Sequence, residues 1–396
     1  MGLRNQKQKI FPVIRFLGFE GSWEQRKLSS IVDRITRKNT DLESTLPLTI
    51  STQDGLVDQV TYFNNRVASQ NISNYYLVKN GEFAYNKSSS DGYPFGTVKR
   101  LDLYDMGVLS TLYIVFALKD QNVNSDFLAC YYDTDNWYKQ VSERAAEGAR
   151  NHGLLNISAE DFLDTDLMIP PDIQEQALIG DYLKKLDNLI ALHQNTFETL
   201  TKIKTVMLET MFPQRGSLVP ELRFTGFTNT WEQRKLSELT DSIDTGKSKF
   251  EVKEDGDYEI LGSTSVIGYD DSYDYEGGFI LTARVGANAG NLYRHSGKVK
   301  ISDNTVFIQG DNLEFIYYLL DSFDIKRLSF GTGQPLVKAS ELKSLDLRVP
   351  QSETERREIG QFLKSIDEII TLHRRKYEKL KQIKQAMLQK MFEPTP

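Results

Sequence analysis

The stretch FPVIRFLGFEGSWEQRKLS at residues 11–29 returns as VPELRFTGFTNTWEQRKLS at residues 219–237, at an offset of 219 − 11 = 208. A second block at residues 169–212 returns at residues 349–392, at an offset of 349 − 169 = 180. Self-similarity of this kind indicates the architecture before single elements are considered. The repeated unit is therefore an opening signature, a variable body and a long helix, used in tandem.

The bodies between the repeated blocks are less alike than the blocks themselves. They lie at about residues 32–168 and 240–348, differ in length by 208 − 180 = 28 residues, and share little obvious sequence. A duplicated frame with diverged bodies predicts that one pseudo-symmetric scaffold presents two different ligands.

The second repeated block is predicted to be a long helix in both copies. Seam positions, apolar except for one histidine in each copy, recur at alternating steps of four and three from Ile179 to Leu200, and again from Ile359 to Leu380. This seam is typical of a coiled coil. Prolines flank both blocks where a helix can begin but not continue: Pro170, Pro171 and Pro350 before them, Pro213 and Pro394 after them.

About forty residues at ~1.5 Å per residue form a rod of roughly 60 Å, which cannot leave its apolar seam in water. We expect the two rods to pair antiparallel, so that a twofold axis relates the two halves. His193 and His373 occupy matched positions in the seam. We expect them to form a hydrogen-bonded pair, because no nearby Cys, Asp or Glu at suitable spacing completes a metal site.

The bodies are predicted to be mixed α/β. Short β-branched or aromatic segments bounded by Gly, Asp and Asn are typical strands, and they occur at residues 112–118, 258–261, 279–283 and 305–309. The fold class is therefore two mixed α/β domains joined by two long helices that form an antiparallel coiled coil. The predicted boundaries are 1–168 for the first domain, 169–213 for the first helix, 214–348 for the second domain and 349–396 for the second helix.

Composition sets mild limits on function. The net charge of −7 disfavours a general polyanion binder but is compatible with local basic grooves. The single cysteine, Cys130, excludes an intramolecular disulfide and agrees with a reducing cytosol. No basic-then-apolar leader opens the chain, and its longest apolar stretch is far shorter than the ~20 residues that span a bilayer. We expect a soluble cytoplasmic protein.

Catalytic motifs are mostly missing from the sequence. Residues 246–248, Gly-Lys-Ser, resemble the end of a phosphate loop, but position 241 is Asp where that loop requires Gly. Neither a GxGxxG with a following acidic residue nor a GxSxG occurs. Pro170 and Pro171 lack the preceding Asn and following aromatic residue of an amino-methyltransferase loop. A duplicated scaffold without such motifs is typical of a protein that binds on behalf of other subunits.

The repeated motifs together resemble the specificity subunit (HsdS) of a Type I restriction-modification system. The two openings, the helix entries IPPDIQEQALIG and VPQSETERREIG, and the closing Met-Phe followed by Pro carry the resemblance, which covers the whole chain in both halves. The resemblance implies that each body is a target recognition domain for one half of a bipartite DNA site, and that the helices fix the unread spacer. It also implies that the chain has no catalytic activity of its own.

The resemblance further implies partners and cofactors. The expected partners are double-stranded DNA, two methyltransferase (HsdM) subunits and two restriction/translocase (HsdR) subunits, with no membrane. S-adenosylmethionine, ATP and Mg would be used by those subunits, so no cofactor and no metal is expected in this chain.

Candidate DNA-binding residues lie on polar loops of the two bodies, most of them in residues 85–96 and 284–294. Phosphate contacts are expected from Lys and Arg, and base contacts from Arg, Asn, Gln, Ser, Thr and Tyr. The candidates in the first body are Asn86, Lys87, Ser88, Tyr93, Lys99, Arg150 and Asn151. The candidates in the second body are Thr264, Ser265, Arg284, Asn288, Arg294, Asn304, Lys326 and Gln334.

Two alternative functions belong to other classes. The first is a coiled-coil adaptor whose bodies bind proteins, which the acidic composition slightly favours. Sequence-specific, salt-dependent DNA binding would exclude it. The second is a stand-alone DNA-modifying enzyme, which the missing cofactor and catalytic motifs disfavour.

Overall fold

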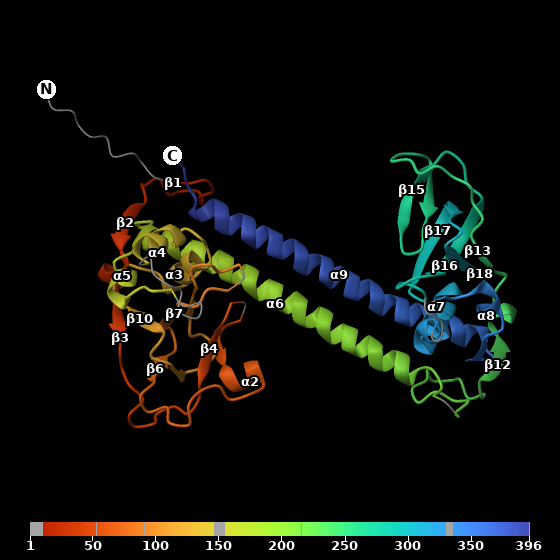
Figure 1. Cartoon of the computed structure of the whole chain (residues 1–396), viewed down its shortest axis with the longest axis horizontal. Coiled ribbons are helices and arrows are strands. Elements are labelled where there is room, and N and C mark those ends of the chain that lie inside the picture. Colours follow the sequence, from red (N-terminus) through yellow and green to blue (C-terminus); the bar gives the residue numbers. More distant parts are fainter. Residues whose placement is uncertain are drawn as a thin grey trace. The chain divides into compact units, whose positions relative to one another are not determined.

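The chain is divided into two compact units that share the long helices. The computed structural model describes residues 11–395, apart from residues 53, 91, 146–154, 215 and 330–335. Unit 1 comprises Met1–Leu192 and Lys376–Pro396, and unit 2 comprises His193–Arg375. Helix α6 (Ile173–Thr210) and helix α9 (Glu353–Phe392) each pass from one unit into the other (Figure 1). Each unit therefore contains part of both helices.

The two long helices run antiparallel within each unit. In unit 1, Leu183 and Leu186 near the start of α6 share a core with Leu380 and Met387 near the end of α9. Unit 2 pairs the start of α9 with the end of α6 in the same way. This confirms the predicted coiled-coil pair.

The predicted histidine contact is also present. His193 Nδ1 and His373 Nδ1 lie 3.0 Å apart, within hydrogen-bonding distance. In the part of the chain that the structure describes, no group of three or more His, Cys, Asp or Glu side chains could hold a metal ion. No helix of the same residues is long and apolar enough to cross a bilayer.

A four-stranded antiparallel sheet forms the centre of the body of unit 1. Its order is β3-β10-β7-β8. These strands are β3 (Val32–Ile35), β10 (Ile114–Leu118), β7 (Phe83–Asn86) and β8 (Thr97–Arg100). Four two-stranded sheets accompany it: β1 (Phe11–Pro12) with β20 (Pro394–Thr395), β2 (Glu24–Lys27) with β11 (Asp166–Ile169), β4 (Leu48–Ser51) with β5 (Gly55–Asp58), and β6 (Tyr76–Lys79) with β9 (Met106–Leu109).

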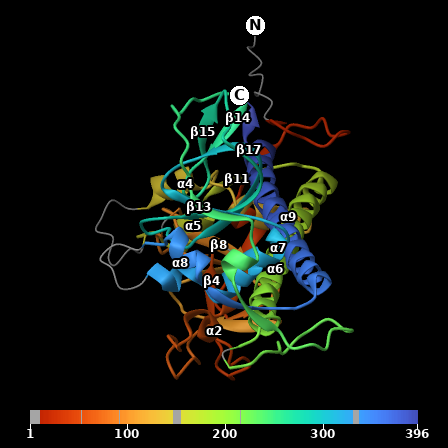
Figure 2. The ribbon, with the colours of Figure 1, turned by 90° about the vertical axis from the view of Figure 1, so that its right-hand side faces the viewer.

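The sheet of unit 2 contains the same arrangement with two more strands. Its order is β13-β18-β16-β17-β14-β15, and Figure 2 shows β14, β15 and β17 from the side of this unit. These strands are β13 (Ser242–Thr245), β18 (Thr305–Gln309), β16 (Tyr275–Ala283), β17 (Leu292–Ile301), β14 (Tyr258–Leu261) and β15 (Val266–Asp270). A two-stranded sheet pairs β12 (Glu232–Lys235) with β19 (Asp346–Val349). The predicted strands are confirmed as β10, β14, β16 and β18.

The strand registers show that the two central sheets are equivalent. In unit 1, Phe83 pairs with both Arg100 and Phe116. In unit 2, Ile280 pairs in the same way with Arg294 and Ile308. Strands β3, β10, β7 and β8 therefore correspond to β13, β18, β16 and β17, although the bodies share little obvious sequence.

Short helices complete each body. Unit 1 contains α1 (Leu28–Ile31), α2 (Gln59–Phe63), α3 (Ser125–Tyr132), α4 (Tyr138–Arg144) and α5 (Ala159–Leu163). Unit 2 contains η2 (Leu236–Glu238), α7 (Leu313–Phe323), η3 (Ile325–Ser329) and α8 (Ala339–Lys343). Helix α3 caps its first turn with Asn124, whose side chain accepts a hydrogen bond from the Phe127 amide, a common way to satisfy a free helix N–H.

The opening signature attaches each body to the start of a long helix. Its EQRK residues form β2 or β12, which pairs with the strand that leads into α6 or α9. Upstream, Arg15 donates two hydrogen bonds to the buried Glu175 carboxylate, at 2.6 and 2.7 Å, and Trp23 Nε1 donates a third at 3.3 Å. The second copy repeats this clamp with Arg223, Trp231 and Glu355. A buried carboxylate needs such partners, which explains why Arg, Trp and Glu recur in both repeated blocks.

Candidate nucleic-acid interface

The two loops selected from the sequence occupy the same place in the two sheets. Residues 87–96 connect β7 to β8, and residues 284–291 connect β16 to β17, the corresponding strand pair. We call them the first and the second hairpin loop. Because the strands on either side are in equivalent register, the fold presents two different loop sequences from one position of one scaffold.

Four of the predicted residues lie in the first hairpin loop or at the end of the strand before it. Asn86 ends β7, and its side chain accepts a hydrogen bond from the Ser88 amide at 3.0 Å. Lys87 reaches the Ile157 carbonyl at 3.4 Å, and the Tyr93 amide donates to the Ser90 carbonyl at 2.9 Å. All four side chains are half-buried. The loop is therefore held by its own polar groups and still presents amide, hydroxyl and phenol atoms.

Lys99 lies apart from that loop, on β8. Its ammonium group contacts Asp133 Oδ1 at 2.7 Å, and Asp133 in turn contacts Lys384 of α9 at 3.1 Å. Lys99, Asp133 and Lys384 all line an open cleft of about 1010 Å³ between the body of unit 1 and the parts of the long helices in that unit. The cleft walls carry cations and carboxylates in nearly equal number, so the cleft is a poor track for phosphates.

One edge of the unit 2 sheet gathers predicted residues from separate loops. The Arg284 amide and the Ser263 hydroxyl both donate to the Asn304 carbonyl, at 2.9 and 3.1 Å. Thr264 and Ser265 follow Ser263 in the turn between β14 and β15, and both are exposed. Thr264, Ser265, Arg284 and Asn304, up to 40 residues apart in sequence, therefore lie close together.

Asn288 and the two glycines shape the second hairpin loop. Asn288 is exposed, and its side chain accepts from the Asn291 amide group at 3.1 Å. Gly286 and Gly290 have φ of 91° and 86°, the left-handed region that favours glycine. A Cβ on Gly290 would lie 2.9 Å from the backbone of Lys326, so η3 packs directly against the loop. Both glycines therefore adopt a backbone conformation that other residues rarely adopt.

Arg294 does not lie at this edge. Its guanidinium contacts Glu314 and lies 3.5 Å from Asp367, and it lies over the Tyr317 ring at 4.2 Å from the centroid. Lys326 lies on η3 with its backbone against Gly290. Arg150, Asn151 and Gln334 lie outside the described residues.

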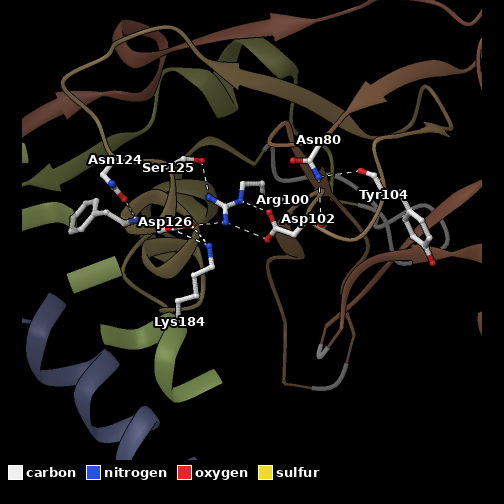
Figure 3. Close-up of polar contacts among 9 residues, drawn as sticks. Asn80, Arg100, Asp102, Tyr104, Asn124, Ser125, Asp126 and Lys184 are labelled. Carbon is white, nitrogen blue, oxygen red and sulfur yellow. Dashed lines mark hydrogen bonds and ion pairs between the residues drawn. The ribbon is translucent and has the colours of Figure 1, made fainter. Parts of the chain in front are cut away.

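The structure also shows exposed or polar residues that were not among the predicted candidates. Tyr62 and Phe63 of α2 are 51% and 49% exposed, with ring centroids 5.0 Å apart, and Asn64 follows in the left-handed conformation. The adjacent aromatic, asparagine and arginine residues of Tyr-Phe-Asn-Asn-Arg could have indicated them. Arg100 is a second such residue: it donates to Asp102, Ser125 and Asp126 (Figure 3).

Five cations between Arg15 and Arg37 are paired with carboxylates. These ion pairs lie within unit 1: Arg15 with Glu175, Arg26 with Asp120, Lys27 with Asp164, Arg34 with Glu160 and Arg37 with Glu82. The Asn122 backbone amide and then the Arg26 side chain hold the pKa of Asp120 below its usual range by hydrogen bonding to its charged form. This segment therefore serves attachment more than phosphate binding.

Comparison with known proteins agrees with this organisation. Residues 22–202 and 228–382 match the family model described as Type I restriction modification DNA specificity domain. The chain is 22% identical over 431 aligned positions to the Type I restriction enzyme MjaVIII specificity subunit of Methanocaldococcus jannaschii, with 96% of this chain and 95% of that protein covered.

A solved structure shows the same fold. The S subunit of a Type I restriction-modification system from M. genitalium superposes with a TM-score of 0.68 at 16% identity, covering 98% of this chain and 100% of that one. The family model alone spans most of the chain, one match in each repeat. The chain therefore belongs to the Type I restriction-modification DNA specificity family, as a non-catalytic subunit that recognises DNA sequence.

Proposed function

We propose that each body reads one half of a bipartite DNA site through its hairpin loop. The observation that carries this proposal is that two equivalent sheets present unlike loops from the same position. A shared scaffold keeps the approach to the duplex constant, while the side chains on the loop select the bases. The recognition domains would be residues 1–168 and 214–348, with the helices at 169–213 and 349–396.

The exposed loop side chains suit different tasks. In unit 2, Arg284 is exposed, and among the described residues no ion pair to its guanidinium is seen. An arginine in that state can bond a guanine edge with two donors. Asn288, Thr264, Ser265 and Asn304 would add amide and hydroxyl contacts. In unit 1, Asn86, Lys87, Ser88 and Tyr93 would play the corresponding part.

Methyltransferase subunits would dock on the long helices. The outer face of α6 in unit 1 carries the exposed Leu189 and Leu192, and the matched positions of α9 in unit 2 carry Ile369 and Leu372. Two matched apolar pairs would suit two copies of one partner, one on each repeat. Two restriction/translocase subunits would then join the complex. S-adenosylmethionine, ATP and Mg would belong to these partners.

The function is tested first by mapping methylation. The full chain is co-expressed with its methyltransferase partner in a methylation-free host, and N6-methyladenine is located by single-molecule sequencing. A bipartite motif with a fixed gap is expected. A folded complex that leaves DNA unmethylated would favour the adaptor alternative. Inserting one heptad into both helices should change the gap and keep both half-sites, because helix length would set the spacing.

A second experiment tests one residue. Arg284→Ala should weaken binding by about 1–3 kcal/mol and relax a single half-site, because a base contact is lost. Arg327→Ala, on the exposed Arg327 of η3, is the matched control and should preserve both half-sites. A uniform loss on all sequences would instead make Arg284 a phosphate contact.

A further inference from the structure

Each body contacts its long helix through a set of residues that recurs in the other unit. We call this set the joint. In unit 1 the joint comprises Arg100, Asp126 and Asp133 of the body with Gly180, Lys184, Asp187 and Lys384 of the helices. In unit 2 it comprises Arg294, Glu314 and Asp321 with Gly360, Lys364, Asp367 and Lys204.

The centre of each joint is a glycine of the long helix. A Cβ on Gly180 would lie 2.8 Å from the Phe127 nitrogen at the start of α3, and one on Gly360 would lie 2.6 Å from the Phe315 nitrogen at the start of α7. Neither glycine has a left-handed φ. Glycine is needed there for close approach of two backbones, because every other residue would push the body away from the helix.

One turn along the helix, a lysine binds the acid at the start of the body helix. Lys184 Nζ lies 3.2 Å from Asp126, and Lys364 Nζ lies 2.7 Å from Glu314. The same acid also contacts an arginine of the sheet. Arg100 contacts Asp126 (Figure 3), at a distance of 2.6 Å, and Arg294 contacts Glu314. Burial opposes ionisation of Asp126, but Arg100 and Lys184 outweigh it and hold its pKa below the usual range.

A second ion-pair set lies further along the helix. Lys384 contacts Asp187 at 2.7 Å and Asp133 at 3.1 Å. In unit 2, Lys204 contacts Asp367 at 2.8 Å and Asp321 at 3.8 Å. Each body therefore contacts the helices of its unit at three points: the glycine and two sets of ion pairs.

The offsets support common origin of the two joints. Gly180, Lys184 and Asp187 return 180 residues later, and Lys204 returns as Lys384 at the same offset. The body acids return at 314 − 126 = 188 and 321 − 133 = 188. Arg100 and Arg294 are equivalent by strand register. The joint is thus kept while the loops around it differ.

We infer that the joint is a positioning device for DNA recognition, an inference that rests on the proposed function of the bodies. The arginine links the joint to the loop directly, because β8 follows the first hairpin loop and β17 follows the second. A tilt at the glycine therefore moves the strand that carries the loop. Recognition geometry generally tolerates only about 0.5 Å of error. These residues position the loops and touch no base.

Alanine at the glycine is the most direct test. Gly180→Ala must move the backbones apart by about 1 Å to regain ordinary contact, while Ala favours the helix itself. Its matched control is Asp181→Ala, the next and exposed position of α6. For unit 2 the pair is Gly360→Ala with Gln361→Ala, whose side chain is also exposed.

The measurement uses the complete chain with its methyltransferase partner. Binding is compared on DNA in which one half-site at a time is replaced, or the gap is changed by one base pair. Gly180→Ala should lower binding at the wild-type gap by about tenfold, broaden the accepted gap and weaken dependence on one half-site. Gly360→Ala should do the same for the other half-site. Both controls should match the wild type.

The outcomes separate the inference from the proposed function. Glycine variants that keep the wild-type gap and half-site dependence would overturn the joint as a positioning device. A wild-type complex without any bipartite preference would overturn the proposed function instead, and with it the use of the joint for DNA.

If a glycine variant fails to fold, substitutions at Lys184 test the inference without introducing a steric conflict. Lys184→Met removes only the cation and should broaden the accepted gap, and Lys184→Arg should restore the wild-type gap. A Met variant that keeps the wild-type gap would also count against the inference.

Discussion

Unit 1 and unit 2 contain the same central four-stranded sheet and differ in the strands around it. Both contain the four-stranded sheet and the joint, but unit 2 continues its sheet past β17 with β14 and β15, whereas in unit 1 β8 is the last strand. Unit 1 instead has the separate pairs β4–β5 and β6–β9. Contacts to the helices constrain the centre of each body, whereas the strands outside this centre are free to vary.

The units also differ in how the opening signature is held. In unit 2 it continues covalently from α6, and the Leu222 amide donates to the Thr210 carbonyl at 2.9 Å. In unit 1 it is attached to the end of α9 without a covalent link: β1 pairs with β20, the Ile14 amide donates to the Lys390 carbonyl at 2.9 Å, and Trp23 packs against Phe392. We therefore expect the Arg15 clamp to contribute more to holding the opening signature in unit 1 than the Arg223 clamp contributes in unit 2.

The largest expected effect tests this difference. Arg15→Met and Arg223→Met each leave a buried carboxylate without its cation, which costs about 3–5 kcal/mol. Hydrogen exchange should show residues 11–29 opening fully in Arg15→Met, and residues 219–237 opening less in Arg223→Met. Arg234→Met, at a partly exposed arginine with surface pairs, is the control. Equal protection in both variants would remove the distinction between the covalent and the non-covalent attachment.

A smaller difference is expected between two tyrosines of the body helices. Tyr318 donates to Asp367 at 2.6 Å, so Tyr318→Phe should cost about 1.5–3 kcal/mol of unfolding free energy, as for a bond to a charged group. The buried Tyr132 hydroxyl has no hydrogen-bond partner among the described residues. Tyr132→Phe should be neutral or stabilising by up to about 1 kcal/mol. Urea denaturation of both variants decides this, and a clear loss in Tyr132→Phe would contradict it.

The acids of the second ion-pair set should respond oppositely to pH. Burial raises the pKa of Asp133, but Lys99 and Lys384 outweigh it and hold the pKa below its usual 3.8. Burial keeps the pKa of Asp321 above 3.8 despite Lys204. Asp133 therefore stabilises unit 1 above pH 3.8 and loses this contribution as pH falls through its folded pKa. Asp321 costs unit 2 stability as pH rises from 3.8 through its folded pKa.

Replacing each acid with its neutral amide tests these opposite pH dependences. At pH 7, Asp133→Asn should lower stability by about 1–2 kcal/mol, whereas Asp321→Asn should leave it unchanged or raise it. Denaturation followed from pH 7 to pH 3 should show the Asp133→Asn loss shrinking below pH 3.8. A loss of the same size in both variants, constant with pH, would mean that the two joints are electrostatically alike.

The smallest expected effect concerns the histidine pair, where the two repeats contribute identical residues. Replacing both with leucine removes donor and acceptor together and extends the apolar seam, so thermal unfolding should show a gain of about 1 kcal/mol. His193→Leu alone leaves His373 without its partner and should gain less. A loss in the double variant would mean that the pair is required for helix register.

Much of the fold follows from local patterns. Residues 258–261 and 305–309 form strands with the predicted bounds, because apolar residues there are bounded by turn-forming ones. The position of a side chain relative to a distant partner has no such local signal. Arg284 and Arg294 are equally plausible DNA contacts by sequence, yet Arg294 contacts Glu314, 20 residues away, and Asp367, 73 residues away.

The sequence by itself determined the tandem frame, the long helices, their antiparallel pairing and the family, because periodicity and repeated motifs are properties of neighbouring residues. The tertiary structure decided that the two bodies are one fold. Phe83 and Ile280 correspond only through their pairing partners, and Asp126 and Glu314 only through the glycine that each faces. The intervening loops differ in length, which hides the 188-residue offset from sequence comparison, while backbone contact at Gly180 and Gly360 preserves the geometry.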